Sequence, residues 1–287
     1  MSPVPDLSTL PPLRDVIARY ELRTKKSLGQ HFLCDLNLTS RIAAAAGDLT
    51  GCTVFEIGPG PGGLTRALIE SDACQVFAVE KDPRCVAALA ELVVAAKGKL
   101  HLVAGDALKI DLATLAPPAP RSSRESGGEG GRAIVANLPY NIGTELLIGW
   151  LQHMHNFRSL TLMFQSEVAD RLTAQPGSKT YGRLSVIAQF CCEIKRVLDI
   201  PAAAFVPPPK VDSAVVHMTP RLERPTDIAF TTMEKVTAAA FGQRRKMLRS
   251  SLKPLGGEAL LRRANIDPER RAETLSLTEF ESLARLV

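Results

Sequence analysis

A glycine-rich turn, EIGPGPGG at Glu56–Gly63, constrains the fold of this chain more than any other feature. Its glycines Gly58, Gly60 and Gly63 have the spacing GxGxxG, after a strand-like apolar run and before a helix-like segment. Glycine lets the backbone turn tightly and approach a ligand that a Cβ atom would exclude. The motif therefore predicts a strand, a tight turn and a helix. Alone, it fits both a dinucleotide site and a purely structural turn.

Strand-like runs alternate with helix-length segments over much of the chain. The predicted strands are Thr53–Ile57, Gln75–Val79, Leu100–Val103, Ala133–Ala136 and Leu160–Phe164, and the helix-like segments include Leu64–Glu70 and Pro83–Ala96. Strands separated by helices indicate βαβ units and a parallel sheet. The expected fold class is therefore α/β, with a Rossmann-like domain and a small all-helical C-terminal domain.

The chain of 287 residues suits either one large domain or one domain with a smaller one. We expect an N-terminal helical segment over residues 1–50, a Rossmann-like domain over 51–219 and a helical domain over 220–287. A Pro-, Ser- and Gly-rich stretch at 117–132 predicts a solvated insert, although Arg121, Arg124 and Arg132 leave RNA contact open. Strand signals stop near Pro220, and Met233–Leu252 is helix-like despite Gly242.

Composition excludes several other classes. Hydrophobic residues make up 45% of the chain, enough for a full core. The net charge of +5 is compatible with a polyanionic partner without requiring one. None of the six cysteines forms a Cys-x-x-Cys pair, so we expect no metal site and reduced thiols, as in the cytoplasm. No run approaches the ~18 apolar residues of a membrane span, and the N-terminus lacks a secretion-signal pattern.

Three acidic residues lie at the ends of successive predicted strands. Glu80 follows the glycines by about 20 residues, where a carboxylate can accept both ribose hydroxyls. Asp106 follows the third strand, where it can accept a hydrogen bond from an adenine amino group. Glu56 directly precedes the glycines, where it would oppose a pyrophosphate but suit a cation. The set therefore favours S-adenosylmethionine, with its sulfonium and ammonium groups, and resembles the class I methyltransferases.

The sequence Asn137-Leu138-Pro139-Tyr140 follows the strand Ala133–Ala136. The Asn137 side-chain oxygen and the Leu138 carbonyl, held by Pro139, can accept the two hydrogens of an adenine N6 amine. These acceptors would favour pyramidalisation of the nitrogen and return its lone pair for methylation. Tyr140 offers a face on which an extruded base can stack. The motif predicts a catalytic site for an exocyclic amine.

Six further blocks resemble one family over residues from about Leu10 onwards. They are KSLGQHFLCD, NLPYNIGTELL, FQSEVADRL, YGRLSVIAQF, FVPPPKVDSAVV and FGQRRKMLRSSL. Together they resemble the ribosomal RNA adenine N6,N6-dimethyltransferases of the KsgA/RsmA type. The resemblance implies dimethylation of two adjacent adenines near the 3′ end of small-subunit (16S) ribosomal RNA, and a role in small-subunit biogenesis.

The resemblance also implies site residues. With the acids and glycines, the expected cofactor-binding set is Gln30, His31, Leu33, Glu56, Gly58, Gly60, Glu80, Lys81, Asp106, Ala107 and Asn137. The family commonly has asparagine where this chain has His31. The expected catalytic set is Asn137, Leu138, Pro139, Tyr140 and Phe205, with Phe205 either a second wall for the base or a core aromatic.

Basic residues cluster in two regions of the sequence. The expected RNA-binding residues are Arg23, Lys25, Lys26, Arg244, Arg245, Lys246, Arg249 and Lys253. Phosphate contacts from such residues position RNA without selecting its sequence. Arg262, Arg263, Arg270 and Arg271 add charge to the C-terminal domain.

The expected partner is small-subunit ribosomal RNA within a pre-ribosomal particle, bound by a cytoplasmic monomer with no role for DNA or a membrane. Alternatives remain open at this point. They are a large-subunit adenine dimethyltransferase of the macrolide-resistance type, a DNA adenine methyltransferase, and a non-catalytic assembly or mitochondrial transcription factor of the same fold. A dinucleotide oxidoreductase is disfavoured, since it gives Glu56 and Asn137 no role.

Overall fold

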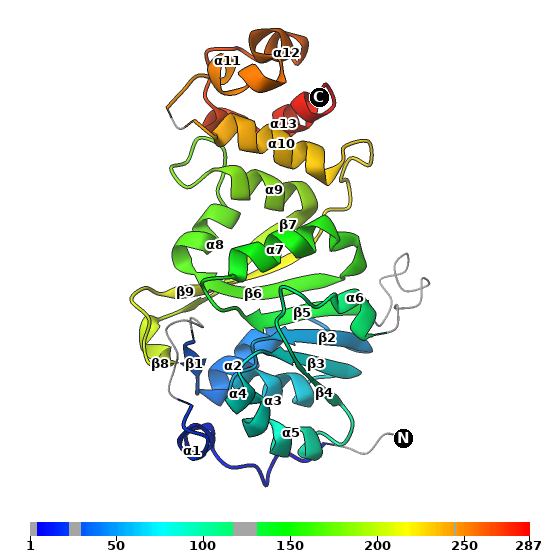
Figure 1. Cartoon of the computed structure of the whole chain (residues 1–287), viewed down its shortest axis with the longest axis vertical. Helices are drawn as coiled ribbons and strands as arrows, with labels where there is room; N and C mark the ends of the chain where they lie inside the picture. The colour runs from blue at the N-terminus through cyan, green and yellow to red at the C-terminus, as the bar shows by residue number, and fades with distance from the viewer. Residues whose placement is uncertain (1–4, 23–29, 117–130, 244) are drawn as a thin grey trace. The chain divides into compact units, whose positions relative to one another are not determined.

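The computed structural model describes residues 5–22, 30–116, 131–243 and 245–287. Within them, a seven-stranded sheet has the order β4-β3-β2-β5-β6-β9-β7, and β1 pairs with β8 in a separate sheet (Figure 1). The strands are β1 (Phe32–Leu33), β2 (Cys52–Ile57), β3 (Gln75–Glu80), β4 (Leu100–Ala104), β5 (Gly131–Asn137), β6 (Ser159–Gln165), β7 (Cys192–Ile200), β8 (Phe205–Val206) and β9 (Ser213–Pro220).

The central strands are parallel, as the sequence predicts. Strand β2 lies between β3 and β5, with Val54 opposite both Val76 and Ala133. Strands β4 and β6 extend the sheet in the same direction on the two sides. Strand β9 is antiparallel to β6, with Leu162 opposite Val216. The α/β fold class is therefore confirmed, and the antiparallel strand is an addition to the predicted parallel sheet.

Helices connect these strands. They are α1 (Leu13–Arg19), α2 (Leu36–Ala44), α3 (Gly63–Glu70), α4 (Pro83–Ala88), α5 (Ala90–Ala95), α6 (Leu112–Leu115), α7 (Gly143–Gln152), α8 (Ser166–Leu172), α9 (Arg183–Cys191), α10 (Phe230–Phe241), α11 (Leu248–Ser251), α12 (Gly257–Arg263) and α13 (Leu277–Ala284). Short 3-10 turns are η3 (Met154–Asn156), η4 (Ala202–Ala204), η5 (Lys253–Leu255) and η6 (Ala272–Thr274). No helix in the described part of the chain is long and apolar enough to span a membrane.

Aspartates fix where several of these helices begin. The Asp35 carboxylate accepts hydrogen bonds from the backbone N–H groups of Asn37 and Leu38 at the start of α2. Asp82 caps α4, where Pro83 occupies the first turn without an N–H to satisfy. These caps fix the first turn of α2 shortly after β1 and the first turn of α4 shortly after β3.

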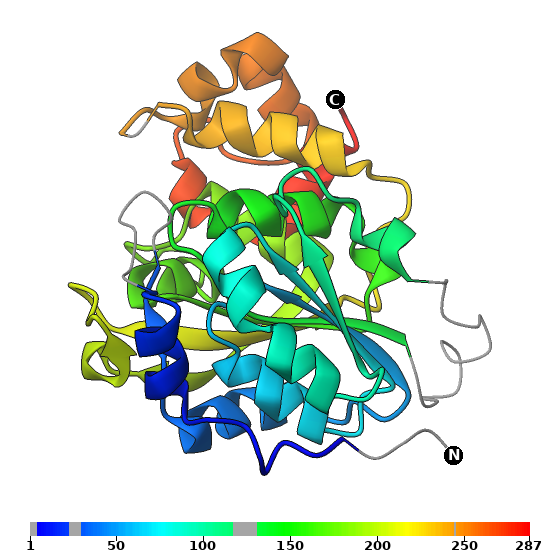
Figure 2. The same ribbon diagram turned by 60° about the horizontal axis from the view of Figure 1, so that its bottom comes forward.

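The central strands β2, β3, β5 and β6 are buried at nearly every position on both faces, which explains their long apolar runs, whereas β7 at the edge of the sheet is largely exposed. On one face, Val54, Val76 and Val135 pack with Ile42 of α2 and Leu68 of α3. The cyan helices α3, α4 and α5 lie together beside the strands in Figure 2. Alternate residues such as Phe55 and Ile134 point to the other face and are also fully buried.

The chain forms two compact units. The first comprises Met1–Ser166 and Lys195–Thr219, and the second comprises Glu167–Ile194 and Pro220–Val287. The second unit thus combines the expected helical domain with a segment that the sequence analysis assigned to the Rossmann-like domain. This grouping follows because α9 packs against α10 and α13.

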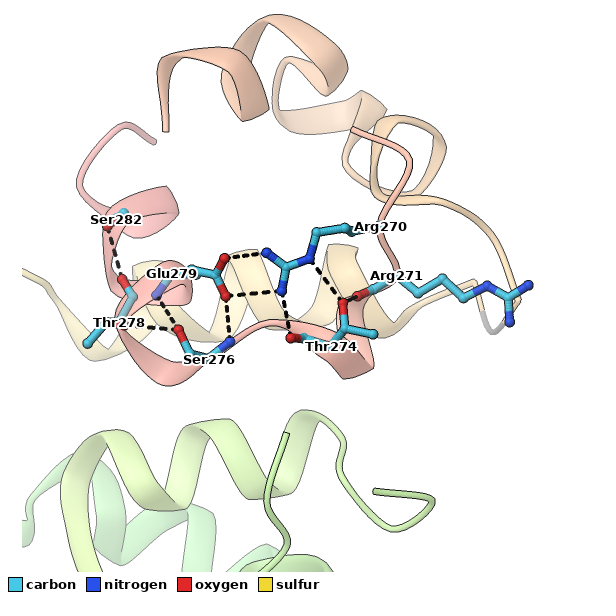
Figure 3. A network of polar contacts seen from close by, with 7 residues as sticks. All are labelled: Arg270, Arg271, Thr274, Ser276, Thr278, Glu279 and Ser282. Atoms are coloured by element: carbon cyan, nitrogen blue, oxygen red, sulfur yellow. Dashed lines mark hydrogen bonds and ion pairs between the residues drawn. The ribbon is translucent and has the colours of Figure 1, made fainter. Parts of the chain in front are cut away.

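A polar network holds the end of the second unit together (Figure 3). Ser276 caps α13 by accepting the backbone N–H of Glu279, whose carboxylate accepts the Ser276 N–H in return. The same carboxylate forms an ion pair with Arg270, and Arg270 also donates to the Thr274 carbonyl at 2.7 Å. The guanidinium of Arg270 therefore has a structural role, whereas that of Arg271 points away from the network.

The structure corrects two predictions about local structure. The predicted helix Met233–Leu252 ends at Phe241, with Gly242 as its C-cap, and a new helix begins at Leu248. Arg245 lies between them with a φ of 78°, which no helix permits. Residues 131–132 belong to β5 rather than to the insert, whose residues 117–130 lie outside the described part of the chain. Arg132 is buried and donates to the Ala116 carbonyl, so its guanidinium is not an RNA contact.

Replacing Gly63 with alanine is expected to destabilise the protein by about 2 kcal/mol, because overpacking of a closed site forces its neighbours to move. The new Cβ atom would lie 2.7 Å from the Leu33 carbonyl oxygen and 3.1 Å from Leu13 Cδ1. Gly149 in α7 is the matched control, since its Cβ would meet nothing within 4 Å. Gly149→Ala should raise stability by about 0.5–1 kcal/mol through helix propensity. Thermal unfolding checks this, and equal shifts of the two variants would contradict it.

Candidate active site

One pocket lies at the carboxyl ends of β2, β3, β4 and β5. In open parallel sheets, ligands bind at the carboxyl ends of the strands. They bind at the point where the chain stops adding strands on one side of the first strand and starts adding them on the other. Here that point falls between β2 and β5. The lining residues are Gln30, His31, Phe32, Leu33, Glu56, Ile57, Gly58, Pro59, Gly60, Pro61, Gly63, Leu64, Val79, Glu80, Lys81, Gly105, Asp106, Ala107, Leu108, Asn137, Leu138, Pro139, Tyr140, Asn141 and Ile142.

The glycine turn forms the floor of this pocket. Gly58 and Gly60 have φ values of 70° and 55°, a conformation that glycine adopts without strain. The N–H of Gly58 donates to the Val79 carbonyl at 2.9 Å, which ties the turn to the neighbouring strand. A Cβ atom on Gly60 would lie 3.0 Å from the Phe32 ring. The turn therefore needs glycine for its conformation and for the close approach of Phe32.

Glu80 is held by the backbone around it. One carboxylate oxygen accepts the Gly60 N–H at 3.1 Å, and the other accepts the Asp82 N–H at 2.7 Å. Burial raises the pKa of Glu80, and these N–H groups oppose that shift. The carboxylate is therefore fixed in position at the end of β3 before any ligand arrives.

Asp106 and Lys81 form an ion pair across the pocket wall, with Nζ and Oδ2 2.8 Å apart. The hydrogen bond from Lys81 and the backbone N–H of Leu108 lower the pKa of Asp106. Asp106 therefore presents a charged acceptor at the end of β4. The Lys81 side chain is largely exposed, so it pairs with Asp106 from the solvent side. The Asp106 carboxylate, which lines the pocket, stays within reach of a ligand.

Glu56 is the least compensated group in the pocket. Its residue is 1% exposed, and its Oε2 atom has no hydrogen-bond partner among the described residues. Burial raises the pKa of Glu56 to about 8, and the nearby Glu80 carboxylate adds a smaller increase. The hydroxyl of Thr65 is likewise buried without a hydrogen-bond partner among the described residues. A buried carboxylate oxygen without a donor fits a cationic ligand, and the ammonium of S-adenosylmethionine is such a group.

The amide of Asn137 at the end of β5 has a defined orientation. Its Nδ2 atom donates to the backbone carbonyl of His31 at 3.3 Å, so its Oδ1 atom remains an acceptor. No hydrogen bond to the Leu138 carbonyl occurs within the described residues, whereas the Pro139 carbonyl accepts the N–H groups of Ile142 and Gly143. The strand tip therefore carries two free acceptors beside one another in sequence.

Tyr140 presents its ring next to these acceptors. The ring stacks on His31, with centroids 5.5 Å apart and planes 29° apart. Its hydroxyl oxygen lies 2.6 Å from Ser213 Oγ, at the start of β9. The His31 side chain lies between Tyr140 and Phe205, and its Nδ1 atom hydrogen-bonds the Pro207 carbonyl at 2.9 Å.

All of the predicted cofactor residues line the pocket, as do four of the five predicted catalytic residues. Phe205 does not line it; its ring is 1% exposed, packs in the main core and meets His31 edge-on. Its environment matches that of a core aromatic, so a base-binding role for Phe205 stays a prediction. His31 contributes its backbone to Asn137 and its side chain to the aromatic cluster.

The predicted RNA-binding residues fall into two groups. Arg23, Lys25, Lys26 and Arg244 lie outside the described residues. Arg245, Lys246, Arg249 and Lys253 are exposed in the second unit. Of these, Arg249 lies 3.5 Å from Glu269 in an ion pair, a pairing across 20 positions that local sequence does not reveal.

Several lining residues, such as Phe32, Asn141 and Ile142, were not predicted, nor were two polar residues outside the lining that hold it in place. Ser213 contacts Tyr140, and Asp82 accepts a hydrogen bond from the Gln30 side chain at 3.2 Å. Asp82 lies two residues after Glu80 at a helix start, a signal that predicts a cap but not a link to the N-terminal segment. For Ser213, the block FVPPPKVDSAVV was identified only by resemblance, without a role for its serine.

Relatives of the chain are close over nearly its whole length. A sequence profile of the family described as ribosomal RNA adenine dimethylase matches residues 21–287. Ribosomal RNA small subunit methyltransferase A of Mesorhizobium japonicum is 57% identical over 282 residues, covering 97% of this chain and 98% of that protein. The protein of the same name from Gluconobacter oxydans is 56% identical over 284 residues, covering 99% and 89%.

Solved structures show the same fold. A dimethyladenosine transferase from Plasmodium falciparum aligns with a TM-score of 0.72 at 24% identity, over 88% of this chain and 96% of that one. The 23S rRNA methyltransferase ErmE aligns with a TM-score of 0.66 at 26% identity, over 89% and 98%. The fold and the pocket thus define a class I S-adenosylmethionine-dependent methyltransferase. The chain belongs to the ribosomal RNA adenine dimethylase family.

Proposed function

We propose that this protein transfers methyl groups from S-adenosylmethionine to N6 of two adjacent adenines near the 3′ end of small-subunit (16S) ribosomal RNA. The product is N6,N6-dimethyladenosine. The observation that carries the proposal is the fixed amide of Asn137, whose donor is used by His31 and whose acceptor is left at the strand tip. Relatives named for the small subunit are 53–57% identical, against 26% for the large-subunit enzyme.

The residues at the strand tip supply what an aromatic amine needs for methylation. When bound, S-adenosylmethionine would supply an electrophilic methyl carbon, whose bond to the sulfonium sulfur breaks in the transfer and leaves a neutral thioether. Asn137 Oδ1 and the Leu138 carbonyl accept the two N6 hydrogens in the first transfer, and one of these oxygens accepts the single hydrogen that remains in the second. Both arrangements favour a tetrahedral nitrogen whose lone pair forms the new C–N bond. Tyr140 stacks on the extruded base, a contact of ~1–3 kcal/mol. The methylated amine then loses a proton to water, so no general base is required.

The remaining pocket residues fit the cofactor. Glu80 would accept the ribose hydroxyls, Asp106 the adenine amino group, and Glu56 the ammonium. Gly58 and Gly60 allow the close approach of the ligand, while Gln30, His31 and Leu33 close the pocket from the N-terminal side. Lys81 and Ala107 flank the two acids that face the nucleoside.

The RNA-binding surface proposed for the second unit consists of exposed cations. Arg245, Lys246, Lys253, Arg263 and Arg271 have no ion pair among the described residues, in contrast to Arg262, which pairs with Glu258. We place the enzyme in the cytoplasm as a monomer acting on a pre-ribosomal small subunit, with no role for DNA. No disulfide joins the six cysteines, all of which lie in the described part of the chain, and thiols without disulfides suit a reducing compartment.

Binding of small-subunit RNA is expected to weaken steeply with salt, because phosphate contacts release counterions. Replacing both Lys246 and Lys253 with glutamine should reduce the slope of log affinity against log salt by about 1.4, at roughly 0.7 per single-strand contact. Filter binding from 50 to 300 mM salt measures the slope. Arg262→Gln is the control, since Arg262 is paired with Glu258. An unchanged slope in the lysine variant would indicate that Lys246 and Lys253 do not contact the RNA phosphates.

Substrate choice tests the proposed function directly. Purified protein and radiolabelled S-adenosylmethionine are incubated with small subunits that lack the modification, with large subunits, and with adenine-rich DNA. We expect label in small-subunit RNA alone. Label in large-subunit RNA alone would indicate the macrolide-resistance type of activity. Binding without any transfer would indicate a non-catalytic assembly or transcription factor.

A further inference from the structure

We infer that Ser213 is a positioning residue that sets the Tyr140 ring for the target base. The inference rests on the proposed function, because it concerns how the stacking face of that site is held. Ser213 lies 73 positions from Tyr140 in sequence and comes from the antiparallel strand β9, outside the strand tips that form the pocket.

The contact is a short hydrogen bond at a buried position. Ser213 is fully buried, and its Oγ atom lies 2.6 Å from the Tyr140 hydroxyl. Tyr140 lies on the turn between β5 and α7. Its backbone holds the side chain at the Cα end only. A hydrogen bond to the phenol oxygen restricts rotation of the ring. A base that stacks on this ring therefore loses less conformational entropy on binding than it would on a freely rotating ring.

Ser213 itself is firmly placed. It lies opposite Gln165 in the β6–β9 pairing. The preceding residue, Asp212, accepts the Ser166 N–H on its carbonyl at 2.9 Å and the Ala202 N–H on its carboxylate at 2.8 Å. Because none of these contacts involves the serine hydroxyl, removing that hydroxyl should release Tyr140 without moving β9.

A second contact restrains the ring of Tyr140. The imidazole of His31 stacks on that ring and is held by the Pro207 carbonyl. The segment from Pro207 to Ser213 therefore restrains Tyr140 twice, through His31 at the face and through Ser213 at the oxygen. This arrangement assigns the Pro-rich stretch before β9 a role in shaping the base site.

A double-mutant cycle tests the inference. Ser213→Ala and Tyr140→Phe each remove one partner of the same hydrogen bond while keeping the strand and the aromatic ring. Each is expected to lower kcat/KM for small subunits about five-fold, the usual effect of one net hydrogen bond. The double variant should lose no more than either single variant, and the dissociation constant of S-adenosylmethionine should change less than two-fold.

The matched control is Thr161→Val. It breaks the Thr161–His217 side-chain hydrogen bond of 2.9 Å in the same β6–β9 pair, away from the pocket, and should leave kcat/KM unchanged. The inference would be overturned if the two losses in kcat/KM multiplied to about 25-fold in the double variant. It would also be overturned if Ser213→Ala kept full activity. Wild-type protein without activity on small subunits would instead overturn the proposed function, and the inference with it.

Discussion

Asn137→Ala is expected to lower the rate of methyl transfer by about 10³-fold, the effect of removing one preorganised group that stabilises charge in a transition state. The loss should fall on kcat, since the acceptor acts on the amine as the new bond forms. Asn137 also lines the cofactor pocket, so the dissociation constant of S-adenosylmethionine should rise less than about ten-fold. Single-turnover methylation and calorimetric cofactor binding measure the two quantities separately.

Two further variants test whether the loss is specific to the Asn137 amide. Asn137→Asp keeps an acceptor but replaces the Nδ2 donor with an oxygen that faces the His31 carbonyl, so its activity should also be strongly reduced. Asn156→Ala removes an amide from η3, outside the pocket lining, and should behave as wild type. Activity of Asn137→Ala within ten-fold of wild type would show that the amide does not act on the reacting nitrogen.

Glu56→Gln is expected to make the ligand-free protein more stable and to weaken cofactor binding by about 10- to 100-fold. The weakening follows from the loss of a buried charge-assisted hydrogen bond to the cofactor ammonium. The gain follows because glutamine replaces a carboxyl group whose ionised form is disfavoured by burial. Isothermal calorimetry and thermal unfolding of the same two proteins measure both effects.

The gain in stability should depend on pH in a defined direction. Burial raises the pKa of Glu56 from 4.5 to about 8, so the folded protein holds this proton more tightly than the unfolded chain. The stability due to that proton is complete below about pH 4.5 and is lost as the pH rises to about 8. The advantage of Glu56→Gln should therefore grow to about 3 kcal/mol at pH 7, at roughly 1.4 kcal/mol per unit of pKa. Glu70→Gln, an exposed site, is the control. A pH-independent difference would contradict the account.

The central fold could be predicted because strands β2, β3, β5 and β6 are buried on both faces. Continuous apolar runs such as Val76–Val79 identify such strands without help from neighbours. The two-residue strands β1 and β8 carry no periodic signal, so they were not predicted. The helix over Met233–Leu252 was predicted too long, because α10 ends at Phe241 and Arg245 has a positive φ before α11 begins, a conformation that composition does not specify.

The pocket could be predicted largely because parallel strands end at one edge of a sheet. Glu56, Glu80 and Asn137 lie in the last two positions of such strands. Asp106 follows one by two residues, so the meeting of these side chains follows from topology. Contacts made by the antiparallel part were not predictable in this way. Ser213 reaches Tyr140 only once β9 has paired with β6, and pairing over such a distance in sequence is decided by packing.

The central claim is that N6 of adenine is the methylated atom. Unmodified small subunits are incubated with the protein and S-adenosylmethionine, and the RNA is digested and analysed by mass spectrometry of its nucleosides and of its 3′-terminal fragment. The account predicts N6,N6-dimethyladenosine at two adjacent positions of that fragment. Methylation at a ring nitrogen, a ring carbon or a ribose hydroxyl would contradict it, because Asn137, Leu138 and Tyr140 would then have no amino group to act on.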